Sequence, residues 1–426
     1  FNRERHCTYR KNYQKNQREF KISIMNTDYS THFTIHNLPY GIFSTPTKHP
    51  RAGIAYENHI IDLSVLFELD FFEGKIKSNV FNQDSLNDFI ALGKESWSFV
   101  RKKIQELLKT DSDLYKENHE RFLYQQSEAV MHLPVKIGDY TDFYSSEEHA
   151  SNVGKMFRPT MDPLLPNWKH MPIAYHGRSS SIITTNTPIK RPSGQILKGE
   201  DVVYSACQTL DIEIELGFII GKENKLGEPV DIQHAHEHVF GAVLLNDFSA
   251  RDIQRWEYQP LGPFLGKNFA TAISPWIVTM EALEQFTTDA PTQTQAILPY
   301  LQEEKRLNFD IEISFDIETA NHNKATVAVT NSKFLYWTME QQVAHHTVNG
   351  CNLQVGDLLG TGTISGKEKN SFGSLLELTW NGKEKINVDT EERTFLQDGD
   401  TTVLRAVCKK GDIQIGFGEV RNVITQ

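Results

Sequence analysis

Acidic and aliphatic residues alternate strictly over residues 211–216, where Asp211, Glu213 and Glu215 are interleaved with isoleucine and leucine. A period of two is typical of a β-strand with one buried face, so the pattern predicts a strand with three carboxylates on its other face. Neighbouring carboxylates on one strand face lie about 6–7 Å apart and repel one another unless a cation lies among them. The pattern is therefore either a solvated strand face or part of a site for a metal ion that prefers oxygen ligands.

Most of the chain beyond Pro134 consists of short apolar runs separated by turn residues. Runs of this length with such boundaries are typical of β-strands. We expect strands over residues 202–204, 210–220, 239–245, 276–280, 309–317, 325–329, 375–380, 402–407 and 413–417, and a helix over residues 334–348. The pattern predicts a mostly β domain over residues 135–426, which is large enough for a substantial core.

The part of the chain before Pro134 has a different pattern. Residues 34–71 contain short strand-like runs with turn signals, which predicts a small β unit. Within residues 84–130, apolar residues recur at helical spacing at Trp97, Val100, Ile104, Leu107 and Leu108. One or two amphipathic helices are expected there, which gives a first domain over residues 25–134. The expected fold class is α+β, mostly β.

The composition excludes several classes of protein. The 426 residues are 39% hydrophobic and 23% charged, which is ordinary for a globular protein. A net charge of −11 disfavours nucleic-acid binding, and no apolar run approaches the roughly 18 residues needed to span a membrane. The cysteines are scattered and form no CxxC pair, which argues against a zinc ribbon or a disulfide framework and indicates a reducing compartment.

Residues 1–24 differ from the rest because they combine seven Lys or Arg with only two Glu. They lack the apolar stretch of a secretory signal. We expect a disordered or extraneous extension upstream of a start at Met25, and the alternative is a basic targeting segment.

Three further motifs have ordinary explanations. The loop 262–267 is one residue short of a P-loop, and Asn268 follows it where a magnesium-binding Ser or Thr would stand. Residues 234–238 contain three histidines, but their neighbours do not decide between strand and helix, and a structural or surface role is favoured over zinc binding. Within residues 345–351, an Asn-Gly break separates two histidines from a cysteine, so we do not expect a thiol catalyst there.

Two polar segments combine the kinds of group that a catalytic site needs. Residues 137–149 gather aspartates, tyrosines and a histidine in a short loop, and loops often hold functional residues on a rigid scaffold. Asp247 follows an apolar strand, and the residues after it put Arg251, Gln254 and Tyr258 on one side of a helix. The alternative for both segments is an ordinary solvated surface.

At these residues the chain resembles the fumarylacetoacetate hydrolase family, and the resemblance extends from about Phe33 to Asn422. The blocks that carry it include HNLPYGIFST, HLPVKIGDYTDFYSSEEHASNVGKMFR, LDIEIELGF, NDFSARDIQRWEYQPLGPFLGKNF and GTISGKEKNSFGSLLELTW. The resemblance implies a small N-terminal SH3-like β-barrel domain with helices. It also implies a large C-terminal catalytic domain that is a mixed β-sandwich or roll, the FAH fold.

The resemblance further implies an activity and a set of residue roles. The activity is hydrolysis of the carbon–carbon bond of 4-fumarylacetoacetate to fumarate and acetoacetate, the last step of tyrosine and phenylalanine catabolism. The implied catalytic residues are His149 as the general base, Glu377 as the carboxylate that orients it, and Arg251, Gln254 and Lys267 around the oxyanion. The implied substrate contacts are Tyr144, Arg158, Tyr175, Gln254, Tyr258 and Thr363.

The implied metal ligands separate the three acids of the alternating strand. The residues that match ligands of a divalent cation are Asp142, Glu213, Glu215 and Asp247, while Lys267 and Thr271 match a second position assigned to magnesium. Asp211 is expected at the margin of the site, either behind a ligand or facing solvent. Ligation by oxygen alone favours Ca²⁺ or Mg²⁺ over zinc.

The chemistry of the reaction calls for residues of these kinds. Water must lose a proton to a base whose pKa is near neutral, which suits a histidine. The tetrahedral oxyanion needs fixed hydrogen-bond donors, and a divalent cation stabilises the leaving enolate. An arginine can hold a substrate carboxylate with two parallel hydrogen bonds.

Two alternatives to this function remain. One is hydrolysis of an acylpyruvate or another diketoacid within the same superfamily, and the other is a catalytically inactive, metal-bound structural protein. The expected partners are a small-molecule diketoacid substrate and a second copy of the chain in a homodimer, with no nucleic acid and no membrane. The expected location is the cytoplasm.

Overall fold

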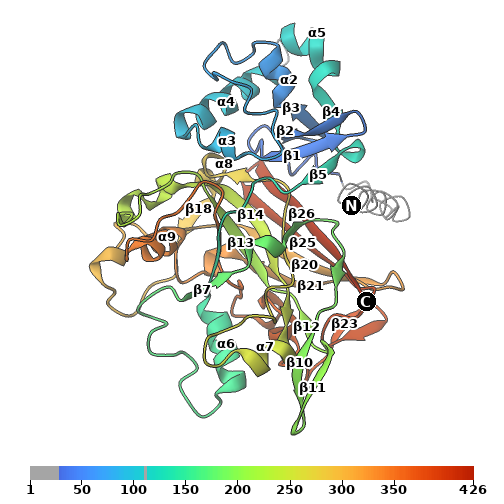
Figure 1. Ribbon diagram of the computed structural model, residues 1–426, viewed down its shortest axis with the longest axis vertical. Helices are drawn as coiled ribbons and strands as arrows, with labels where there is room; N and C mark the ends of the chain where they lie inside the picture. The colour runs from blue at the N-terminus through green and yellow to red at the C-terminus, as the bar shows by residue number, and fades with distance from the viewer. Residues whose placement is uncertain (1–27, 110–112) are drawn as a thin grey trace, which may run out of the picture.

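The N-terminal part of the chain is built around one antiparallel sheet. The computed structural model describes residues 28–109 and 113–426, and the sheet lies at the top of Figure 1 with strand order β4-β3-β2-β1-β5. Its strands are β1 (Tyr40–Thr45), β2 (Lys48–Tyr56), β3 (His59–Asp62), β4 (Leu123–Gln125) and β5 (Val130–His132). The helices beside it are α2 (Leu63–Glu68), α3 (Asn87–Ile90), α4 (Lys94–Leu107) and α5 (Asp113–Phe122). Four of the five apolar residues at helical spacing lie on the buried side of α4, as predicted, and the fifth, Leu108, follows the helix as its C-cap.

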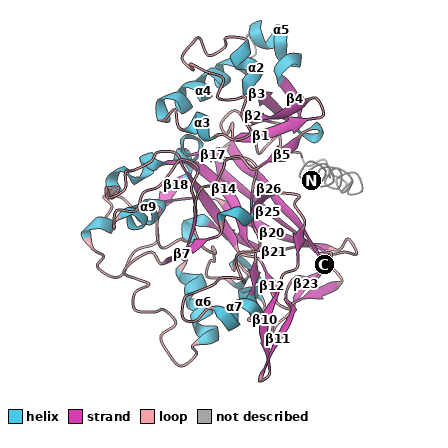
Figure 2. Ribbon diagram, viewed as in Figure 1, coloured by secondary structure: helices cyan, strands magenta, loops and turns pink. Residues whose placement is uncertain are grey.

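The rest of the described chain contains two larger sheets (Figure 2). An eight-stranded sheet has the order β7-β6-β22-β13-β14-β16-β8, with β17 paired to β14. Its strands are β6 (Tyr140–Phe143), β7 (Ala174–Gly177), β8 (Ile182–Thr184), β13 (Ile214–Ile220), β14 (Val239–Asp247), β16 (Thr271–Ile273), β17 (Val278–Thr279) and β22 (Leu358–Gly360). A five-stranded sheet has the order β21-β20-β25-β26-β9 and consists of β9 (Ile189–Lys190), β20 (Glu312–Glu318), β21 (Lys324–Asn331), β25 (Thr401–Lys410) and β26 (Ile413–Thr425).

Shorter elements surround these sheets. The two-stranded ladders pair β10 (Ser193–Lys198) with β11 (Asp201–Ala206), β12 (Leu210–Asp211) with β15 (Ser249–Ala250), β18 (Thr287–Asp289) with β19 (Leu307–Phe309), and β23 (Ile386–Val388) with β24 (Glu391–Arg393). The helices are α6 (Glu147–Phe157), α7 (Arg251–Glu257), α8 (Met280–Leu283), α9 (Met339–Thr347) and α10 (Leu375–Leu378), and η3 (Ile232–His238) is a 3₁₀ helix.

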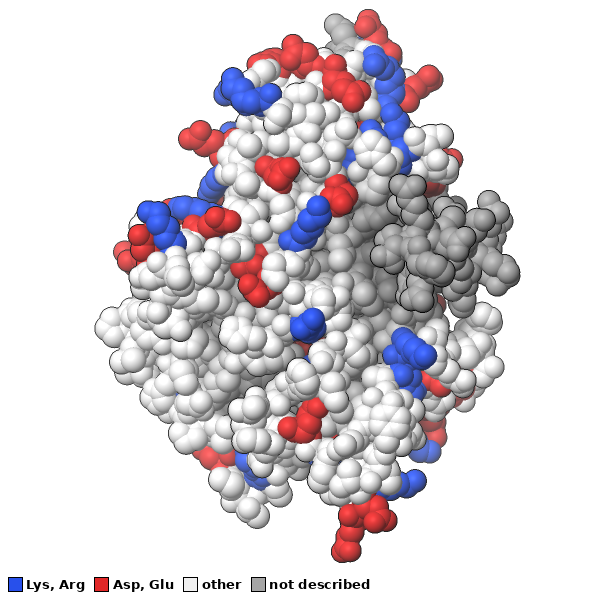
Figure 3. Space-filling view, viewed as in Figure 1, with Lys and Arg blue, Asp and Glu red and all other residues white. Residues whose placement is uncertain are grey.

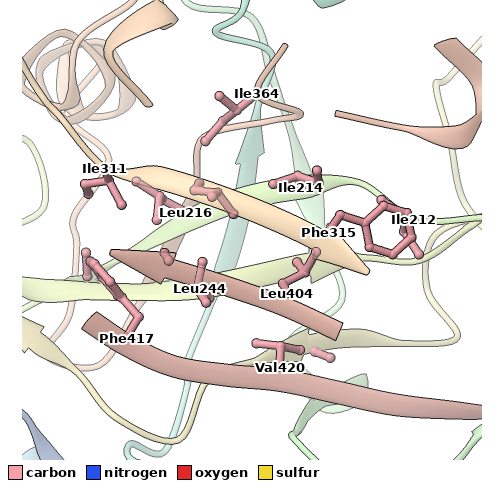
Figure 4. Close-up of a cluster of buried hydrophobic side chains, with 14 of the residues drawn as sticks. Ile212, Ile214, Leu216, Leu244, Ile311, Phe315, Ile364, Leu404, Phe417 and Val420 are labelled. Atoms are coloured by element: carbon pink, nitrogen blue, oxygen red, sulfur yellow. The ribbon is translucent and has the colours of Figure 1, made fainter. Parts of the chain in front are cut away.

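The main core lies where the two larger sheets face each other. Leu216 of β13 and Leu244 of β14 pack with Phe315, Phe417 and other fully buried residues of the five-stranded sheet (Figure 4). Burial of such side chains stabilises the fold by roughly 1.5–3 kcal/mol each. The five-stranded sheet therefore covers one face of the eight-stranded sheet. The loops at the ends of the eight-stranded sheet can hold functional groups on this scaffold.

The predicted fold class is confirmed, since the chain combines an N-terminal sheet domain with helices and a large C-terminal sheet domain. The prediction for residues 1–24 lies outside the described residues. No helix within residues 28–109 and 113–426 is long and apolar enough to cross a membrane.

The expected strand over residues 375–380 is wrong, because this segment begins with the helix α10. Ser374 caps the helix by accepting a hydrogen bond from the backbone N–H of Glu377 through its hydroxyl. The carboxylate of Asp211 accepts from the N–H groups of Leu375 and Leu376. A short apolar run fits a strand or a buried helix equally well, and here these polar partners decide for the helix.

The alternating acidic segment is not a half-buried strand. It is divided between β12 and β13, and Glu213 forms an isolated bridge with Ser374. Asp211 and Glu215 are fully buried, and Glu213 is 5% exposed. The alternative of a solvated strand face is therefore wrong, because all three acids of the segment are buried.

Candidate active site

Four carboxylates from three segments of the chain meet at the ends of interior strands of the eight-stranded sheet. Asp142 comes from β6, Glu215 from the start of β13, and Asp247 from the last position of β14, while Glu213 directly precedes β13. One ligand atom of each lies within 4.8 Å of the others, and all four residues are buried. The sequence prediction of these four acids as one group therefore has a matching geometry.

A glycine in the intervening strand makes room for this group. Gly360 of β22 lies between Asp142 on β6 and Gly217 on β13. A Cβ atom at Gly360 would lie 2.9 Å from Oδ1 of Asp142 and 3.2 Å from Oε2 of Glu215. The backbone N–H of Gly362 donates to Oε2 of Glu215 at 3.0 Å. A side chain in this strand would thus displace the carboxylates.

The cluster holds more negative charge than its neighbours neutralise. Burial and the charge of Asp247 raise the pKa of Asp142 well above its usual value, and burial and the charge of Asp142 do the same to the pKa of Glu215. Within the described residues, Oδ1 of Asp142 and Oε1 of Glu215 are buried without a hydrogen-bond partner. Unpaired buried carboxylates are costly unless a cation compensates them. Four oxygen donors of this kind fit Ca²⁺ or Mg²⁺.

Lys267 and Arg251 neutralise only one side of the cluster. The ammonium of Lys267 contacts Oε2 of Glu213 and lies 2.6 Å from Oδ2 of Asp247. Nη2 of Arg251 lies 2.8 Å from Oε1 of Glu213. Burial opposes ionisation of Glu213, but these two positive charges lower its pKa to about 2. Thr271 donates to Oδ1 of Asp247 at 2.8 Å, so both oxygens of Asp247 are occupied.

A histidine and a glutamate form a second group beside the acids. Nδ1 of His149 lies 2.7 Å from Oε2 of Glu377, and both side chains are buried. Ser146 caps α6 and thereby fixes the helix turn that holds His149. With Nδ1 bonded to the carboxylate, Nε2 is the ring nitrogen that is left to accept a proton.

Three polar side chains that the sequence did not identify hold Glu377 in place. Asn152 donates to Oε1 at 2.9 Å, and Ser365 and Ser374 each donate to Oε2 at 2.9 Å. Burial disfavours the carboxylate form, but the charge of His149 and these hydrogen bonds hold the pKa of Glu377 below its usual value. Two sequence signals were available: the spacing of His149 and Asn152, three residues apart in a helix, and the Ser-x-x-Glu capping pattern of Ser374 and Glu377. Ser365 comes from a separate loop and gave none.

Asp211 was expected either behind a ligand or facing solvent, and the second alternative is wrong. Its side chain is fully buried, and its Oδ2 lies 2.9 Å from Nε of Arg251. Nη1 of Arg251 lies 3.4 Å from Oε1 of Gln254 one turn later in α7. Asp211 thus stands behind the arginine, while the arginine faces the acid cluster through Glu213.

The predicted substrate contacts lie at different depths. Tyr175 donates to Oδ2 of Asp247 at 3.1 Å, and the ring of Tyr144 lies 5.2 Å from that of His149 at an angle of 81°. Thr363 is buried in the loop after β22. Arg158 follows α6 and donates from Nη2 to the carbonyl of Pro163, while its Nε is buried without a partner in the described chain.

Tyr258 differs from these residues because 47% of its side chain is exposed at the end of α7. Its hydroxyl accepts a hydrogen bond from Gln259 at 3.2 Å. The structure therefore brings Tyr144 and Tyr175 to the charged groups and leaves Tyr258 on the outer side.

The three motifs for which we expected no separate metal-binding, nucleotide-binding or thiol chemistry make ordinary contacts in the structure. His234 lies 3.0 Å from Glu237, and His238 lies 2.7 Å from the carbonyl of Lys222, both in or beside η3. His346 bonds to Thr141 at 2.9 Å, and the thiol of Cys351 points to the carbonyl of Asn352. The loop 262–267 delivers Lys267 to the acid cluster, a position that its glycines permit because Gly266 packs directly on the backbone of α7.

Two family models match the chain. Residues 139–425 match the model described as fumarylacetoacetate (FAA) hydrolase C-terminal, and residues 36–134 match the one described as fumarylacetoacetase N-terminal. The chain is 51% identical to fumarylacetoacetase of Dictyostelium discoideum over 415 residues, which cover 94% of this chain and 97% of the relative. It is 49% identical to fumarylacetoacetase of Homo sapiens over 400 residues, which cover 91% and 94%.

A solved structure supports the same fold. Fumarylacetoacetate hydrolase from psychrophilic Exiguobacterium antarcticum superposes with a TM-score of 0.54 at 18% sequence identity and covers 91% of this chain and 99% of its own. On this fold, the histidine–glutamate pair and a group of buried acids that could hold a metal ion define a hydrolase. The chain belongs to the fumarylacetoacetate hydrolase family.

Proposed function

We propose that this chain hydrolyses the carbon–carbon bond of 4-fumarylacetoacetate and releases fumarate and acetoacetate. This is the last step of tyrosine and phenylalanine catabolism. The observation that carries the proposal is the His149–Glu377 pair at 2.7 Å beside the buried acids, in a chain about half identical to fumarylacetoacetases over nearly its full length.

His149 is the proposed general base. Glu377 fixes the ring through Nδ1, so Nε2 takes a proton from the water that attacks the ketone carbon next to the fumaryl double bond. The carboxylate also stabilises the imidazolium that results. The carbon–carbon bond then breaks, its electron pair passes to the acetoacetate carbon, and that carbon takes up a proton.

Arg251, Gln254 and Lys267 are the proposed donors to the oxyanion. All three lie on α7 or on the loop that follows it, and Arg251 and Lys267 already reach the acid cluster. Loss of one such donor typically lowers the rate by about 10²–10³-fold. Arg158 is the proposed partner of a substrate carboxylate, because its buried Nε has no partner among the described residues. The other proposed substrate contacts are Tyr144, Tyr175, Tyr258 and Thr363.

Asp142, Glu213, Glu215 and Asp247 are the proposed ligands of Ca²⁺ or Mg²⁺. Their fit rests on the unpaired oxygens of Asp142 and Glu215 and on a donor set made of oxygen alone. When bound, the cation would supply positive charge where negative charge develops on the diketone oxygens. A second magnesium position at Lys267 and Thr271 would use their oxygen atoms, since a protonated lysine Nζ has no lone pair for a metal.

The remaining proposals follow from the family resemblance. They are a homodimer, a cytoplasmic location and a division of the chain at residues 134–135. Light scattering coupled to size-exclusion chromatography tests the first of these.

Substrate comparison tests the proposed function directly. Purified protein is assayed with fumarylacetoacetate and with acetylpyruvate, each with and without EDTA. We expect faster turnover of fumarylacetoacetate, and loss of turnover with EDTA that added Ca²⁺ or Mg²⁺ restores. Preference for acetylpyruvate would favour the acylpyruvate hydrolase alternative, and absence of turnover with both substrates and either cation would favour an inactive structural protein.

A further inference from the structure

Asp211 is a fully buried carboxylate for which the proposed reaction has no direct use. Each of its oxygens accepts two hydrogen bonds, from the backbone N–H of Ile212 at 2.7 Å and of Leu375 at 2.8 Å on Oδ1, and from the N–H of Leu376 and Nε of Arg251, both at 2.9 Å, on Oδ2. Its acceptor capacity is thus filled, and no oxygen is left for a metal ion or substrate.

These hydrogen bonds connect Asp211 to α10 and α7, the helices that hold Glu377 and Arg251. Leu375 and Leu376 begin α10, whose next residue is Glu377, the partner of His149. Arg251 begins α7 and is a proposed oxyanion donor. Asp211 itself is fixed by the β12–β15 ladder, in which it pairs with Ser249.

Asp211 also counteracts the electrostatic attraction between Arg251 and the acid cluster. The guanidinium lies between Asp211 at Nε and Glu213 at Nη2, with distances of 2.9 and 2.8 Å. Without the first contact, the arginine would be drawn toward the surplus negative charge of the cluster. Its remaining group, Nη1, would then leave the side of Gln254.

We propose that Asp211 is a positioning residue that holds the guanidinium of Arg251 in a fixed place relative to Glu377 and His149. The oxyanion donor and the general base then share one rigid frame. Misplacement of a catalytic group by about 1 Å is enough to lower a rate by about 10²-fold. This inference rests on the proposed role of Arg251 in catalysis.

A buried acid elsewhere in the fold provides a matched control. Asp400 is also fully buried, accepts from Nε and Nη2 of Arg393 at 2.9 Å each, and accepts from the N–H of Gln397 at 2.8 Å. It therefore has the same partners in kind, an arginine and the backbone, but none of them belongs to the proposed site.

The test is a double-mutant cycle measured by kcat, KM and the thermal midpoint. Asp211→Asn is expected to lower kcat by about 10–100-fold with KM changed by less than about 3-fold, since an amide cannot accept at both positions. Asp400→Asn is expected to lower the thermal midpoint and to leave kcat unchanged. In an Arg251→Gln background, Asp211→Asn should change kcat by less than about 3-fold, because the group it positions is gone.

Several outcomes would overturn the inference. They are a wild-type kcat for Asp211→Asn, the same fractional loss with and without Arg251, or an equal loss of kcat in Asp400→Asn. Wild-type turnover by Arg251→Gln alone would overturn the oxyanion role of Arg251 and this inference with it. If Asp211→Asn does not fold, Asp211→Glu keeps the charge but shifts the guanidinium by one methylene, and an unchanged kcat in that variant would refute the proposal.

Discussion

Two groups of acidic side chains in this molecule differ in how far nearby positive charges neutralise them. On the C-terminal five-stranded sheet, Nη1 and Nη2 of Arg421 donate to the two oxygens of Glu318 at 2.7 and 3.1 Å. Arg405 joins Asp316 at 2.7 Å to Glu419 at 2.8 Å. Each acid of this paired-charge cluster thus has a cationic partner, and the hydrogen bond from Arg421 is the main reason that the pKa of Glu318 falls to about 2.

The active-site acids lack this balance. Lys267 and Arg251 serve Glu213 and Asp247, while Asp142 and Glu215 keep buried oxygens without a partner in the described chain, and their pKa values are raised. On the face shown in Figure 3, charged groups of both signs are interspersed. The fold can therefore pair its acids, and the surplus of negative charge at the site supports the proposed cation site.

The largest effect is expected from His149→Ala. Loss of a general base typically lowers the rate by about 10²–10⁴-fold, and we expect kcat to fall within that range while cation affinity stays unchanged. The reason is that the hydrogen bond of His149 goes to Glu377 and that His149 is not one of the four clustered acids. Steady-state kinetics and calorimetric titration with Ca²⁺ measure the two quantities on the same preparation.

His238→Ala is the matched control, because His238 is also buried but, within the described residues, its hydrogen bond goes to the backbone carbonyl of Lys222. Its kcat should equal that of the wild type. Normal turnover in His149→Ala, or an equal loss in both variants, would remove His149 from the role of base.

Glu318→Gln is expected to reduce stability and leave catalysis intact. The substitution weakens the paired contact with Arg421 and leaves that arginine half-buried with less compensation, so the free energy of unfolding should fall by about 1–2 kcal/mol. Urea denaturation measures this change, and kcat should stay within about 2-fold of the wild type. A large loss of kcat with unchanged stability would contradict the division between a structural and a functional cluster.

Glu340, a half-buried residue outside the site, shows what happens to a carboxylate that has no cationic partner in the described part of the chain. Burial raises its pKa to about 7, and its Oε2 has no partner among the described residues. Because the folded state keeps this proton above the unfolded pKa, the stabilisation is complete below about pH 4.5 and is lost as the pH rises to about 7. Glu340→Gln should therefore raise the free energy of unfolding by about 1–3 kcal/mol at pH 8 and by little at pH 5.

The exposed Glu312→Gln serves as its control and should change the thermal midpoint equally little at both pH values. A stabilisation by Glu340→Gln that is the same at pH 5 and pH 8 would show that the charge of the buried carboxylate is not its cause.

The sequence predicts the parts of the site that lie in compact motifs. The acids of residues 211–216 lie close together and alternate with aliphatic residues, and the family resemblance separates the proposed ligands Glu213 and Glu215 from Asp211. The β-rich C-terminal part and the helix α4 also follow from their periodicity. These features depend on local pattern, which a single sequence preserves.

What the sequence could not supply depends on contacts between distant segments. Residues 375–380 look like a strand, and only Ser374 and the distant Asp211 make them begin as a helix. Asp211 has the same spacing as its two neighbours, yet its burial behind Arg251 follows from the separate β12–β15 ladder. Ser365 donates a hydrogen bond to Glu377 from another loop, and no sequence motif predicts this contact.

The central claim is that the surplus acids form a cation site, and calorimetric titration tests it most directly. Chelator-treated wild-type protein, Glu215→Gln and Glu318→Gln are each titrated with Ca²⁺ in two buffers of different ionisation enthalpy. We predict that the wild type and Glu318→Gln bind Ca²⁺ with the same affinity and release protons, because the raised pKa values of Asp142 and Glu215 fall when the cation binds. Glu215→Gln should bind at least about 10-fold more weakly. Equal affinity in all three proteins would contradict the account.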